Sequence, residues 1–277
     1  MGPIVLETGL GGRLDATNAI PPEHVLVTVI TPIALDHQQW LGETLAEIAG
    51  EKAGIIKPGV PLVSARQEPE AERVIRQAAA SRGAKPVEFL AAVTGETGLR
   101  PGLEGPHQME NAALAVAALR AAGLEIGDGH IERLAAVRWR GRFERLLDGR
   151  VIVDGAHNSH AASALAKTWR RTFGRRRAQL IFGSVAGKDP RSMLRLLAPL
   201  AREIVYVSVD SSRGVPAQTL ADLHPEASLP RHVIPSLEDA MDYALQNRGR
   251  VLITGSLFLA GEAISLVEKK TREPSDQ

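Results

Sequence analysis

Short apolar runs alternate with longer amphipathic stretches through the second half of the chain. The apolar runs lie at 151–153, 179–182, 203–207 and 251–254, and stretches of helical periodicity follow at 159–173, 190–201, 237–246 and 257–269. Strands that are apolar on both faces and alternate with helices predict a parallel sheet covered by helices on each side.

The first half shows the same alternation with more glycine. We expect strands at 3–6, 24–30 and 60–63 and helices at 43–56, 68–82, 108–122 and 131–137. Pro58-Gly59 and Gly83 end two of these helices, and residues 95–105, with four glycines and a proline, form a loop. We place a domain boundary near Trp139, giving domains 1–138 and 139–277, and expect the tail 271–277 to be frayed.

Composition excludes several kinds of site. The 277 residues are 44% apolar and 23% charged, as in soluble globular proteins of up to two domains. A net charge of +1 gives no reason to expect a nucleic-acid or membrane partner, and no apolar run approaches the roughly 20 residues that span a bilayer. The absence of cysteine excludes disulfides and thiolate sites, and we expect a cytoplasmic protein.

A glycine-rich motif, Glu7-Thr-Gly-Leu-Gly-Gly12, follows the first predicted strand. Ligands bind at the carboxyl ends of strands in parallel sheets, and glycine lets the backbone approach them closely. The spacing does not match the G-x-G-x-x-G dinucleotide fingerprint. The residues alone leave two alternatives open, a ligand site or a tight turn with a solvated glutamate.

Asp36-His37 and Lys52 form a second candidate group. The first pair follows the second predicted strand, although a lone histidine is more often a core or surface residue than a ligand. A lysine on an apolar helix normally extends its amine to water. The alternative is a desolvated, neutral Lys52 that takes up carbon dioxide and becomes a carbamate, an oxygen ligand for Mg²⁺. Spacing does not decide between them.

The second half has its own motif at a strand end, Asp154-Gly-Ala-His-Asn158, which joins a carboxylate and an imidazole to a helix N-terminus. His157 and His160 lie one helical turn apart, but no third ligand accompanies them, which disfavours zinc. The run 183–189 has three residues between its glycines and Asp189 after its lysine, so it is not a phosphate loop. For the basic run 170–177 we favour a solvated helix end over nucleic-acid binding.

Taken in order, the motifs resemble those of folylpolyglutamate synthase and dihydrofolate synthase, a branch of the Mur ligase superfamily. The similarity lies in residues 7–18, 33–37, 41–44, 51–59, 107–111, 141–144, 154–158, 187–189 and 255–257. It implies an α/β fold, in which an incomplete P-loop-type Mur ligase central domain precedes a Rossmann-like C-terminal ligase domain with a mainly parallel sheet.

The resemblance also implies an activity. An ATP-dependent ligase of this family adds L-glutamate to the γ-carboxylate of folate through an acyl phosphate, and whether dihydropteroate is a second acceptor stays open. ATP and Mg²⁺ are the implied cofactors, with K⁺ as a further candidate. Phosphoryl transfer depends mostly on positioning and charge neutralisation, which agrees with the polar residues of the motifs.

Individual roles follow from the resemblance. The implied metal ligands are Glu7 and His37, and Lys52 is the carbamylated lysine of the catalytic site. The implied pterin contacts are Arg13, Leu14 and Asp15. The implied ATP contacts are Asn111, Arg142, Asp154 and His157, and His157 also lies near the incoming amino acid. Without the resemblance, Arg142 is equally well explained as an interdomain salt bridge, and residues 107–111 as a polar helix start.

No G-x-x-x-x-G-K-[ST] phosphate loop occurs anywhere in the sequence. We therefore expect the first domain to lack its first strands, its triphosphate cradle and the Ser or Thr ligand of Mg²⁺, and the isolated chain to be inactive. Three hypotheses remain: part of a ligase whose longer relatives are monomeric, a ligase completed by a second chain, or a non-catalytic relic that binds a nucleotide or a partner. We favour the first.

Overall fold

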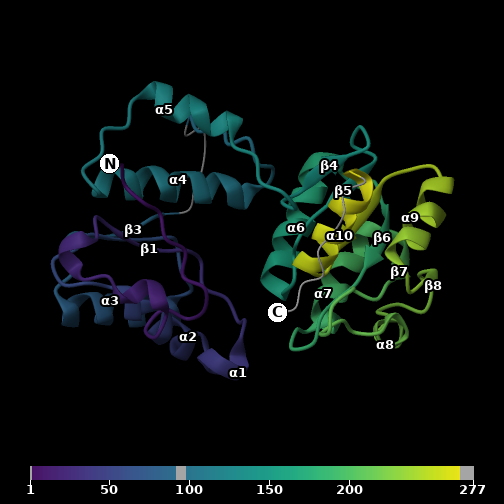
Figure 1. Cartoon of the computed structure of the whole chain (residues 1–277), viewed down its shortest axis with the longest axis horizontal. Helices are drawn as coiled ribbons and strands as arrows, with labels where there is room; N and C mark the ends of the chain where they lie inside the picture. The colour runs from purple at the N-terminus through teal and green to yellow at the C-terminus, as the bar shows by residue number, and fades with distance from the viewer. Residues whose placement is uncertain (1, 92–97, 269–277) are drawn as a thin grey trace. The chain divides into compact units, whose positions relative to one another are not determined.

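The computed structural model describes residues 2–91 and 98–268, and these fall into two compact units (Figure 1). The first unit comprises residues 1–102 and 107–137, and the second comprises 103–106 and 138–277. The loop predicted over 95–105 lies partly outside the described residues, and Lys269 and the tail 271–277 lie wholly outside them. None of the helices in the described part of the chain combines the length and apolarity needed to cross a bilayer.

The first unit is built on a three-stranded parallel sheet in the order β1-β2-β3, with β1 at Thr28–Ile30, β2 at Leu62–Ser64 and β3 at Val87–Phe89. Neighbouring residues of β2 face opposite sides. Leu62 packs into the core made with α2 (Leu45–Lys52) and α3 (Pro69–Arg82), and Val63 packs with Leu114 of α4 (Pro106–Ala121). Figure 1 shows the sheet between these two helical layers.

Several predictions for the first unit need correction. Residues 3–6 form no strand, and Ile4 and Val5 are 79% and 92% exposed. Their residue types favour a strand, but among the described residues no strand pairs with them. Of the strand predicted over 24–30, only β1 is confirmed. Its first predicted residue, His24, belongs to the 3₁₀ helix η2 (Pro22–His24). The short strand β3 was missed because Glu88 interrupts its apolar pattern.

Two of the predicted helices of this unit agree with the structure. The helix expected at 68–82 is confirmed within one residue, with Gly83 in the left-handed conformation as its C-cap. The helix expected at 43–56 is α2 followed by η3 (Ala53–Ile55), and a capping box between Thr44 and Glu47 sets its start. The remaining short elements are α1 (Gln38–Leu41), η1 (Ala16–Ala19), α5 (Asp128–Glu132) and η4 (Arg133–Ala136).

The glycine-rich segment 9–18 docks on the C-terminal end of α2. The backbone N–H of Arg13 donates to the carbonyl of Glu51 at 2.9 Å. A Cβ atom on Gly12 would lie 2.8 Å from that carbonyl oxygen and 2.9 Å from the carbonyl oxygen of Lys52. Only glycine permits this approach, so the motif is fixed against the helix that carries Lys52.

The carbonyls that follow α2 are satisfied from two directions. The last carbonyls of a helix have no donor within it, and leaving them buried without a partner is costly. Arg82, at the end of α3, donates from Nη1 to the carbonyls of Ala53 and Gly54 at 2.9 and 2.7 Å. The side-chain amide of Asn18 donates to Gly54 O at 3.2 Å and to Arg13 O at 3.0 Å. One helix end therefore holds the loop and α3 together.

The second unit contains a six-stranded sheet in the order β4-β5-β9-β6-β7-β8, parallel except for β4 against β5. The strands are β4 (Glu144–Leu146), β5 (Val151–Val153), β6 (Ala178–Phe182), β7 (Ala201–Tyr206), β8 (Arg231–Val233) and β9 (Val251–Thr254). The helices are α6 (Ser159–Phe173), α7 (Pro190–Leu197), η5 (Ala198–Leu200), α8 (Ala217–Ala221), α9 (Leu237–Gln246) and α10 (Leu257–Glu268).

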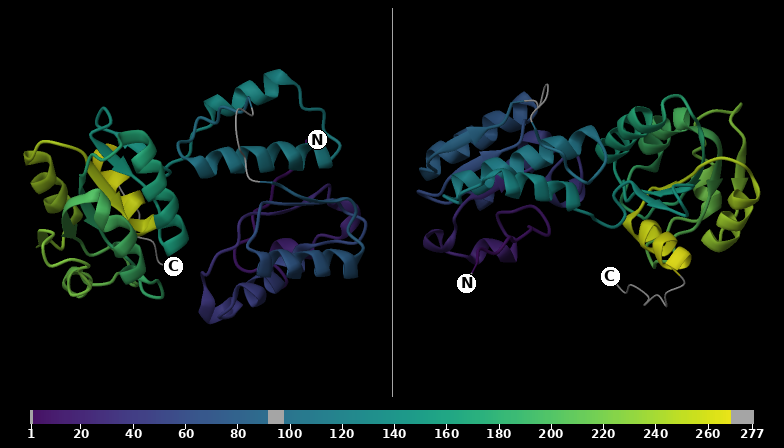
Figure 2. Two further views of the ribbon diagram at one scale, coloured as in Figure 1. Left: turned by 180° about the vertical axis from the view of Figure 1, so that it is seen from behind. Right: turned by 90° about the horizontal axis from the view of Figure 1, so that it is seen from above.

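Alternate residues of these strands enter two different cores. Ile152 and Leu180 pack with α6 and α7, whereas Val153 and Ile181 pack with α9 and α10. The views in Figures 1 and 2 show helices on both faces of this sheet. The predicted mainly parallel α/β sheet is confirmed, as are the helices at 159–173 and 237–246. Strands β4 and β8 were missed because each has only one apolar residue among its three, which gives little strand signal. Helix α8 was missed because its five residues are too few for a helical period to show.

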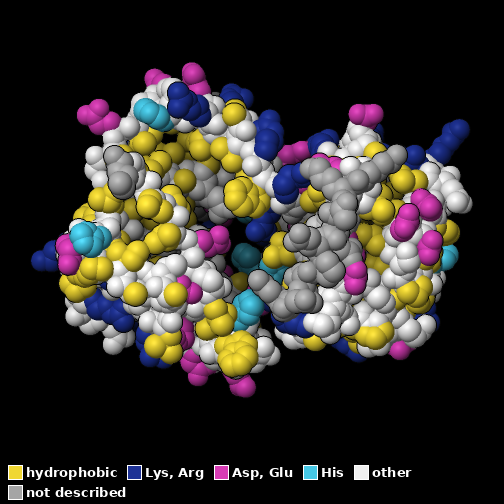
Figure 3. Space-filling view, viewed as in Figure 1, with side chains coloured by type: hydrophobic (Ala, Val, Ile, Leu, Met, Phe, Trp, Pro, Cys, Tyr) yellow, Lys and Arg dark blue, Asp and Glu magenta, His cyan; other side chains and the backbone are white. Residues whose placement is uncertain are grey.

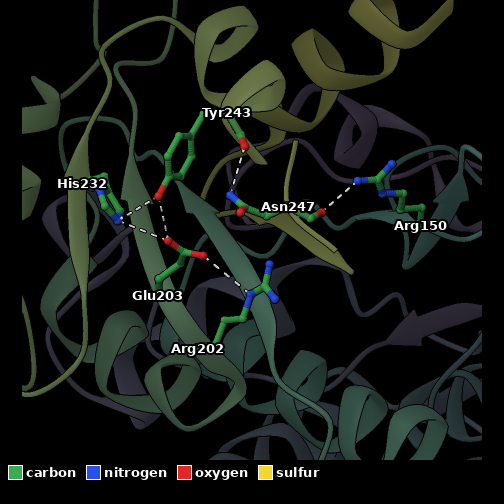
Figure 4. A network of polar contacts seen from close by, with 6 residues as sticks. All are labelled: Arg150, Arg202, Glu203, His232, Tyr243 and Asn247. Atoms are coloured by element: carbon green, nitrogen blue, oxygen red, sulfur yellow. Dashed lines mark hydrogen bonds and ion pairs between the residues drawn. The ribbon is translucent and has the colours of Figure 1, made fainter. Parts of the chain in front are cut away.

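Polar side chains secure the edge of this sheet at which the parallel strands begin. Arg150 precedes β5 and donates to the carbonyl of Leu245 in α9 and to that of Asn247, which follows α9. Figure 4 shows the contact with Asn247. Glu203 of β7 accepts a hydrogen bond from the Tyr243 hydroxyl at 3.0 Å and lies 3.1 Å from His232 Nε2. These contacts join β7, β8 and α9, so the cluster of Glu203, His232 and Tyr243 has a structural role.

One buried carboxyl lies in the apolar core beneath the opposite edge. Glu262 of α10 is 7% exposed, and its Oε1 accepts a hydrogen bond from the backbone N–H of Asp210 at 2.8 Å. Burial raises the pKa of this carboxyl to about 7. Because the folded-state pKa lies above the value in the unfolded chain, the side chain binds its proton more tightly when folded, and stability falls as pH rises from about 4.5 to about 7.

We therefore predict that Glu262→Gln stabilises the protein increasingly as pH rises. The amide keeps the acceptor for Asp210 but cannot ionise, so its advantage over the native chain should grow by about 2 kcal/mol between about pH 5.5 and pH 8.5. Urea unfolding at the two pH values measures this difference. Glu226→Gln, at an exposed position, is the control, and a gap for Glu262→Gln that stays constant with pH would contradict the prediction.

A second prediction concerns the docking of segment 9–18. Gly12→Ala should destabilise the protein by about 1–3 kcal/mol, because its Cβ would collide with two backbone carbonyls that cannot move without unwinding α2. Gly50→Ala is the matched control in α2 itself, where a Cβ meets nothing within 4 Å, and it should stabilise by about 0.5–1 kcal/mol. Equal effects of the two substitutions in chemical unfolding would show that the close approach is unimportant.

Candidate functional site

The sequence-predicted site residues lie in both units. The first unit carries Glu7, Arg13, Leu14, Asp15, His37, Lys52 and Asn111. The second unit carries Arg142, Asp154 and His157.

Asp15 shapes the glycine-rich loop. Its Oδ2 accepts hydrogen bonds from the backbone N–H groups of Gly9 and Leu10 at 2.9 and 3.1 Å. Its Oδ1 accepts from the N–H and the hydroxyl of Thr17 at 3.0 and 2.6 Å, which makes Asp15 the N-cap of η1. The hydrogen bonds from Thr17 and the backbone lower the pKa of Asp15 to about 2. Both carboxylate oxygens thus bond within the loop.

The two residues before Asp15 are presented to solvent. Leu14 is 80% exposed. The Arg13 guanidinium forms an ion pair with Glu51 of α2, with Nε 3.0 Å from Oε1. Of the three predicted pterin contacts, Arg13 and Leu14 are therefore on the surface of the loop, and Asp15 holds the loop in shape.

His37 stands in an unusual backbone conformation at the start of α1. Its φ of 52° lies in the left-handed region, which is costly for a residue other than glycine and is concentrated at functional sites. Its backbone N–H donates to Asp36 Oδ1 at 2.8 Å, and its Nε2 lies 3.9 Å from Asp36 Oδ2. Asp36, a residue without a predicted role, thus orients the histidine.

The other predicted metal ligand, Glu7, is exposed and lies in an irregular segment rather than at a strand end, which corrects the predicted placement. Among the described residues no group of three His, Asp or Glu side chains is arranged to hold a metal ion. The assignment of Glu7 and His37 to a metal stays a prediction.

Lys52 is the last residue of α2, and it is partly buried. Burial lowers the pKa of its ammonium group, and the negative charge of Asp36 acts in the opposite direction. The free-energy difference between the ammonium and the neutral amine is therefore smaller than in water. A neutral amine is what reaction with carbon dioxide requires, so the environment of Lys52 fits the carbamate hypothesis.

Asn111 lies in the second turn of α4 and is exposed. Its side-chain Nδ2 donates to Oε1 of Gln108, one turn earlier, at 3.2 Å. Gln108 is buried, with its Nε2 3.1 Å from Nε2 of His107. The polar start of α4 is therefore an ordered network that positions Asn111, and its contact with ATP stays a prediction.

In the second unit, Asp154 follows β5 directly and closes a turn. Its Oδ2 accepts from the N–H of Phe143 and its Oδ1 from the N–H of Ala156, both at 2.9 Å. Phe143 has a φ of 49°, which turns its N–H toward the carboxylate. Burial raises the pKa of Asp154 to about 6, although these hydrogen bonds and the charges of Arg142 and His157 act to lower it.

His157 lies between Asp154 and the start of α6. Its Nδ1 is 2.9 Å from the carbonyl oxygen of Gly155, and because a carbonyl only accepts, Nδ1 carries the proton. In the neutral ring Nε2 then bears the lone pair, so the imidazole can accept a proton there. Asn158 is the N-cap of α6, its Oδ1 accepting from Ala161 N–H at 2.8 Å.

Three motifs that are far apart in the sequence meet at this turn. The N–H of Gly155 donates to the carbonyl of Gly141 at 2.8 Å, and the N–H of Gly255 donates to the carbonyl of Ala156 at 3.1 Å. A Cβ on Gly155 would lie 2.4 Å from Cδ2 of Leu257. The structure therefore brings together segments 141–144, 154–158 and 255–257 at the carboxyl end of β5, where ligands bind in parallel sheets.

Sequence reasoning missed several residues that position the site. Thr17 has a local signal, because an Asp followed two residues later by Thr is typical of an Asx turn. Asp36 was noted only as the neighbour of His37. Arg82 and Phe143 act through contacts that no local pattern contains.

Comparisons with known proteins agree with this arrangement. The profile of the family described as Mur ligase, glutamate ligase domain, matches residues 141–257. The dihydrofolate synthase/folylpolyglutamate synthase of Bacillus subtilis (strain 168) is 35% identical over 289 residues, which cover 94% of this chain and 66% of that protein. The chain thus spans somewhat less than two thirds of the length of this relative.

Solved structures give the same result. The folylpolyglutamate synthase of Mycobacterium tuberculosis, complexed with ADP and AMPPCP, aligns with a TM-score of 0.84 and 31% identity over 97% of this chain and 68% of that one. The bifunctional folylpolyglutamate synthase/dihydrofolate synthase of Yersinia pestis CO92, complexed with AMPPNP and Mn ion, aligns with a TM-score of 0.81 and 29% identity over 94% of this chain and 65% of that one. On this shared sequence and fold, the chain belongs to the folylpolyglutamate synthase/dihydrofolate synthase family of Mur ligases.

Proposed function

We propose that this chain contributes most of the active site of an ATP-dependent ligase that adds L-glutamate to the γ-carboxylate of folate, with dihydropteroate as a second acceptor. The main support is the meeting of segments 141–144, 154–158 and 255–257 at one strand end, within the region that matches the glutamate ligase domain. The nucleotides bound by the Mycobacterium tuberculosis and Yersinia pestis relatives support ATP as the cosubstrate.

The reaction we propose has two steps. A folate carboxylate oxygen takes the γ-phosphoryl group of ATP, releasing ADP, and the amine of glutamate then attacks the acyl carbon. A C–N bond forms, the bond from carbon to the phosphate oxygen breaks, and phosphate leaves. We assign His157 Nε2 as the acceptor of the amine proton, because the Nδ1 contact with Gly155 leaves the lone pair at Nε2. Asp154 and Arg142, beside it, and Asn111 of α4 are assigned to ATP.

A divalent metal completes the proposal. We assign Glu7, His37 and the carbamylated form of Lys52 as its protein ligands, since the lowered pKa of Lys52 favours the amine that forms a carbamate. Mg²⁺, when bound, neutralises charge on the transferred phosphoryl group. The Mn ion of the Yersinia pestis relative supports a divalent cation, and K⁺ stays a candidate for a second site.

The alternative is a non-catalytic protein that binds a nucleotide or a partner, or one half of a split ligase. The specific observation in its favour is the absence of any G-x-x-x-x-G-K-[ST] run in the 277 residues.

We predict that the 277-residue chain alone forms no glutamate adduct and that a polypeptide that also carries a Gly-Lys-Ser/Thr phosphate loop does. The assay is incorporation of radiolabelled glutamate into tetrahydrofolate with ATP and Mg²⁺.

In the active form, Asp154→Asn should lower kcat/KM by at least about tenfold, because the carboxylate that receives two backbone N–H groups is lost.

Two outcomes of this assay would contradict the proposal in different ways. Glutamate addition by the 277-residue chain would contradict the requirement for a phosphate loop. Inactivity of both polypeptides would contradict the ligase function and favour the binding protein.

We further predict that ¹³C-bicarbonate gives a carbamate resonance that belongs to Lys52. In ¹³C NMR the signal should vanish in Lys52→Arg, whose guanidinium forms no carbamate. It should persist in Lys57→Arg, because the Nζ of Lys57 is engaged by the carbonyl of Asn18 at 2.6 Å. A signal lost in both variants or in neither would remove Lys52 from the set of metal ligands.

A further inference from the structure

Trp40 is an exposed aromatic side chain on the short helix α1, whose one buried residue is Leu41. Of the three tryptophans, Trp169 is fully buried against Phe143 and Phe173, whereas Trp40 and Trp139 are both 69% exposed. A single exposed apolar residue needs no explanation, so the neighbourhood of Trp40 decides whether it has one.

The backbone of Trp40 is held within α1, which contacts the glycine-rich loop through Leu41. Its N–H donates to the carbonyl of His37 at 2.8 Å, within the short helix α1. The next residue, Leu41, is buried, and its Cδ2 would lie 3.0 Å from a Cβ on Gly11. Leu41 therefore attaches α1 to the loop, and the side chain of the preceding residue, Trp40, is exposed to solvent.

Apolar side chains of the loop and of the segment before α1 are exposed in the same way. Leu10, Leu14 and Leu35 are 41%, 80% and 45% exposed. The backbone that carries Leu10 is held in place, because Asp15 accepts hydrogen bonds from the N–H groups of Gly9 and Leu10. Hydrophobic side chains also reach the surface elsewhere on the first unit, as the yellow areas of Figure 3 show. What distinguishes this group is that its members flank Arg13 and His37 in the sequence, on a loop and a helix joined by the contact of Leu41 with Gly11.

We propose that Trp40 is a substrate-binding residue whose indole stacks on the aryl ring of the pteroyl acceptor. Offset stacking needs a flat apolar side chain on a rigid support, and an exposed tryptophan on α1 meets both conditions. The inference rests on the proposed function, since it concerns the acceptor of that reaction. It assigns the aromatic contact to a residue outside segment 13–15, to which the acceptor contacts were assigned.

The stacking contact predicts a graded effect on acceptor binding. Trp40→Ala should weaken the binding of dihydropteroate to the 277-residue chain by about tenfold, and Trp40→Phe by less than about threefold, because a phenyl ring still stacks. Trp139→Ala, which removes an equally exposed tryptophan of the second unit, should leave the affinity unchanged. Isothermal titration measures the three affinities, and circular dichroism checks that each variant is folded.

Tryptophan emission provides a second readout that a structural role would not move. In Trp139→Phe, dihydropteroate should quench the emission of Trp40, whereas in Trp40→Phe the emission of the two remaining tryptophans, Trp139 and Trp169, should show no such quenching. Equal affinities of Trp40→Ala and the native chain would overturn the inference and leave the proposed function intact. Equal losses in Trp40→Ala and Trp40→Phe would exclude stacking. No binding by the native chain would overturn the inference together with the acceptor site of the first unit.

Discussion

The close approach of Gly12 to the last carbonyls of α2 is the contact on which the first unit's site depends. A helix end has unsatisfied carbonyls, and here the backbone of the glycine-rich loop donates to Glu51 of α2, while the side chain of Arg82 donates to the carbonyls of Ala53 and Gly54 that follow it. The same contact brings Arg13 beside Glu51 and fixes the loop one residue from Lys52. A side chain at position 12 would separate the loop from the helix, and the residues assigned to the acceptor would lose their fixed relation to the buried lysine.

In the second unit, glycines also bring separate segments into close contact, here at the end of β5. Gly141, Gly155 and Gly255 come from three segments, and each lies where a Cβ or a different φ would push the segments apart. Backbone hydrogen bonds between them hold Asp154 and His157 in place. In both units glycine provides proximity, and the reactive side chains are carried by the neighbouring residues. Polar contacts at the other edge, such as Arg150 on the end of α9, serve the fold alone.

The sequence predicted the parts of this structure that are encoded locally. Helix 159–173 could be predicted because its apolar spacing is regular and Gly174 ends it, and β5 and β9 because they are apolar on both faces. Residues 3–6 have the same apolar character, yet strand formation requires a partner, which a single segment does not specify. The contiguous motif 154–158 could be interpreted directly. The contact of Gly12 with Glu51 and the burial of Lys52 depend on residues about 40 positions apart, so no local pattern contains them.

Burial shifts the pKa values of Lys52 and Asp154 in opposite directions, and both shifts favour the uncharged form of the side chain. It lowers the pKa of Lys52 and raises that of Asp154, and in each case it favours the neutral form of a group that is charged in water. Removing a charge from water is costly unless an opposite charge compensates it. Asp36 does this for Lys52, and Arg142 and His157 do it for Asp154, but only in part, because the shifts persist. Each residue would gain from a further reaction or ligand. Addition of carbon dioxide to the neutral amine of Lys52, with loss of a proton, would give a carbamate anion that a metal cation can balance, and a cation or a proton donor would balance the carboxylate of Asp154. Glu262 shows that a shifted pKa alone does not mark a site, because burial raises its pKa to about 7 in the core of the second unit. The roles proposed for Lys52 and Asp154 therefore depend as much on their positions, at the end of α2 beside the glycine-rich loop and at the end of β5 where three motifs meet.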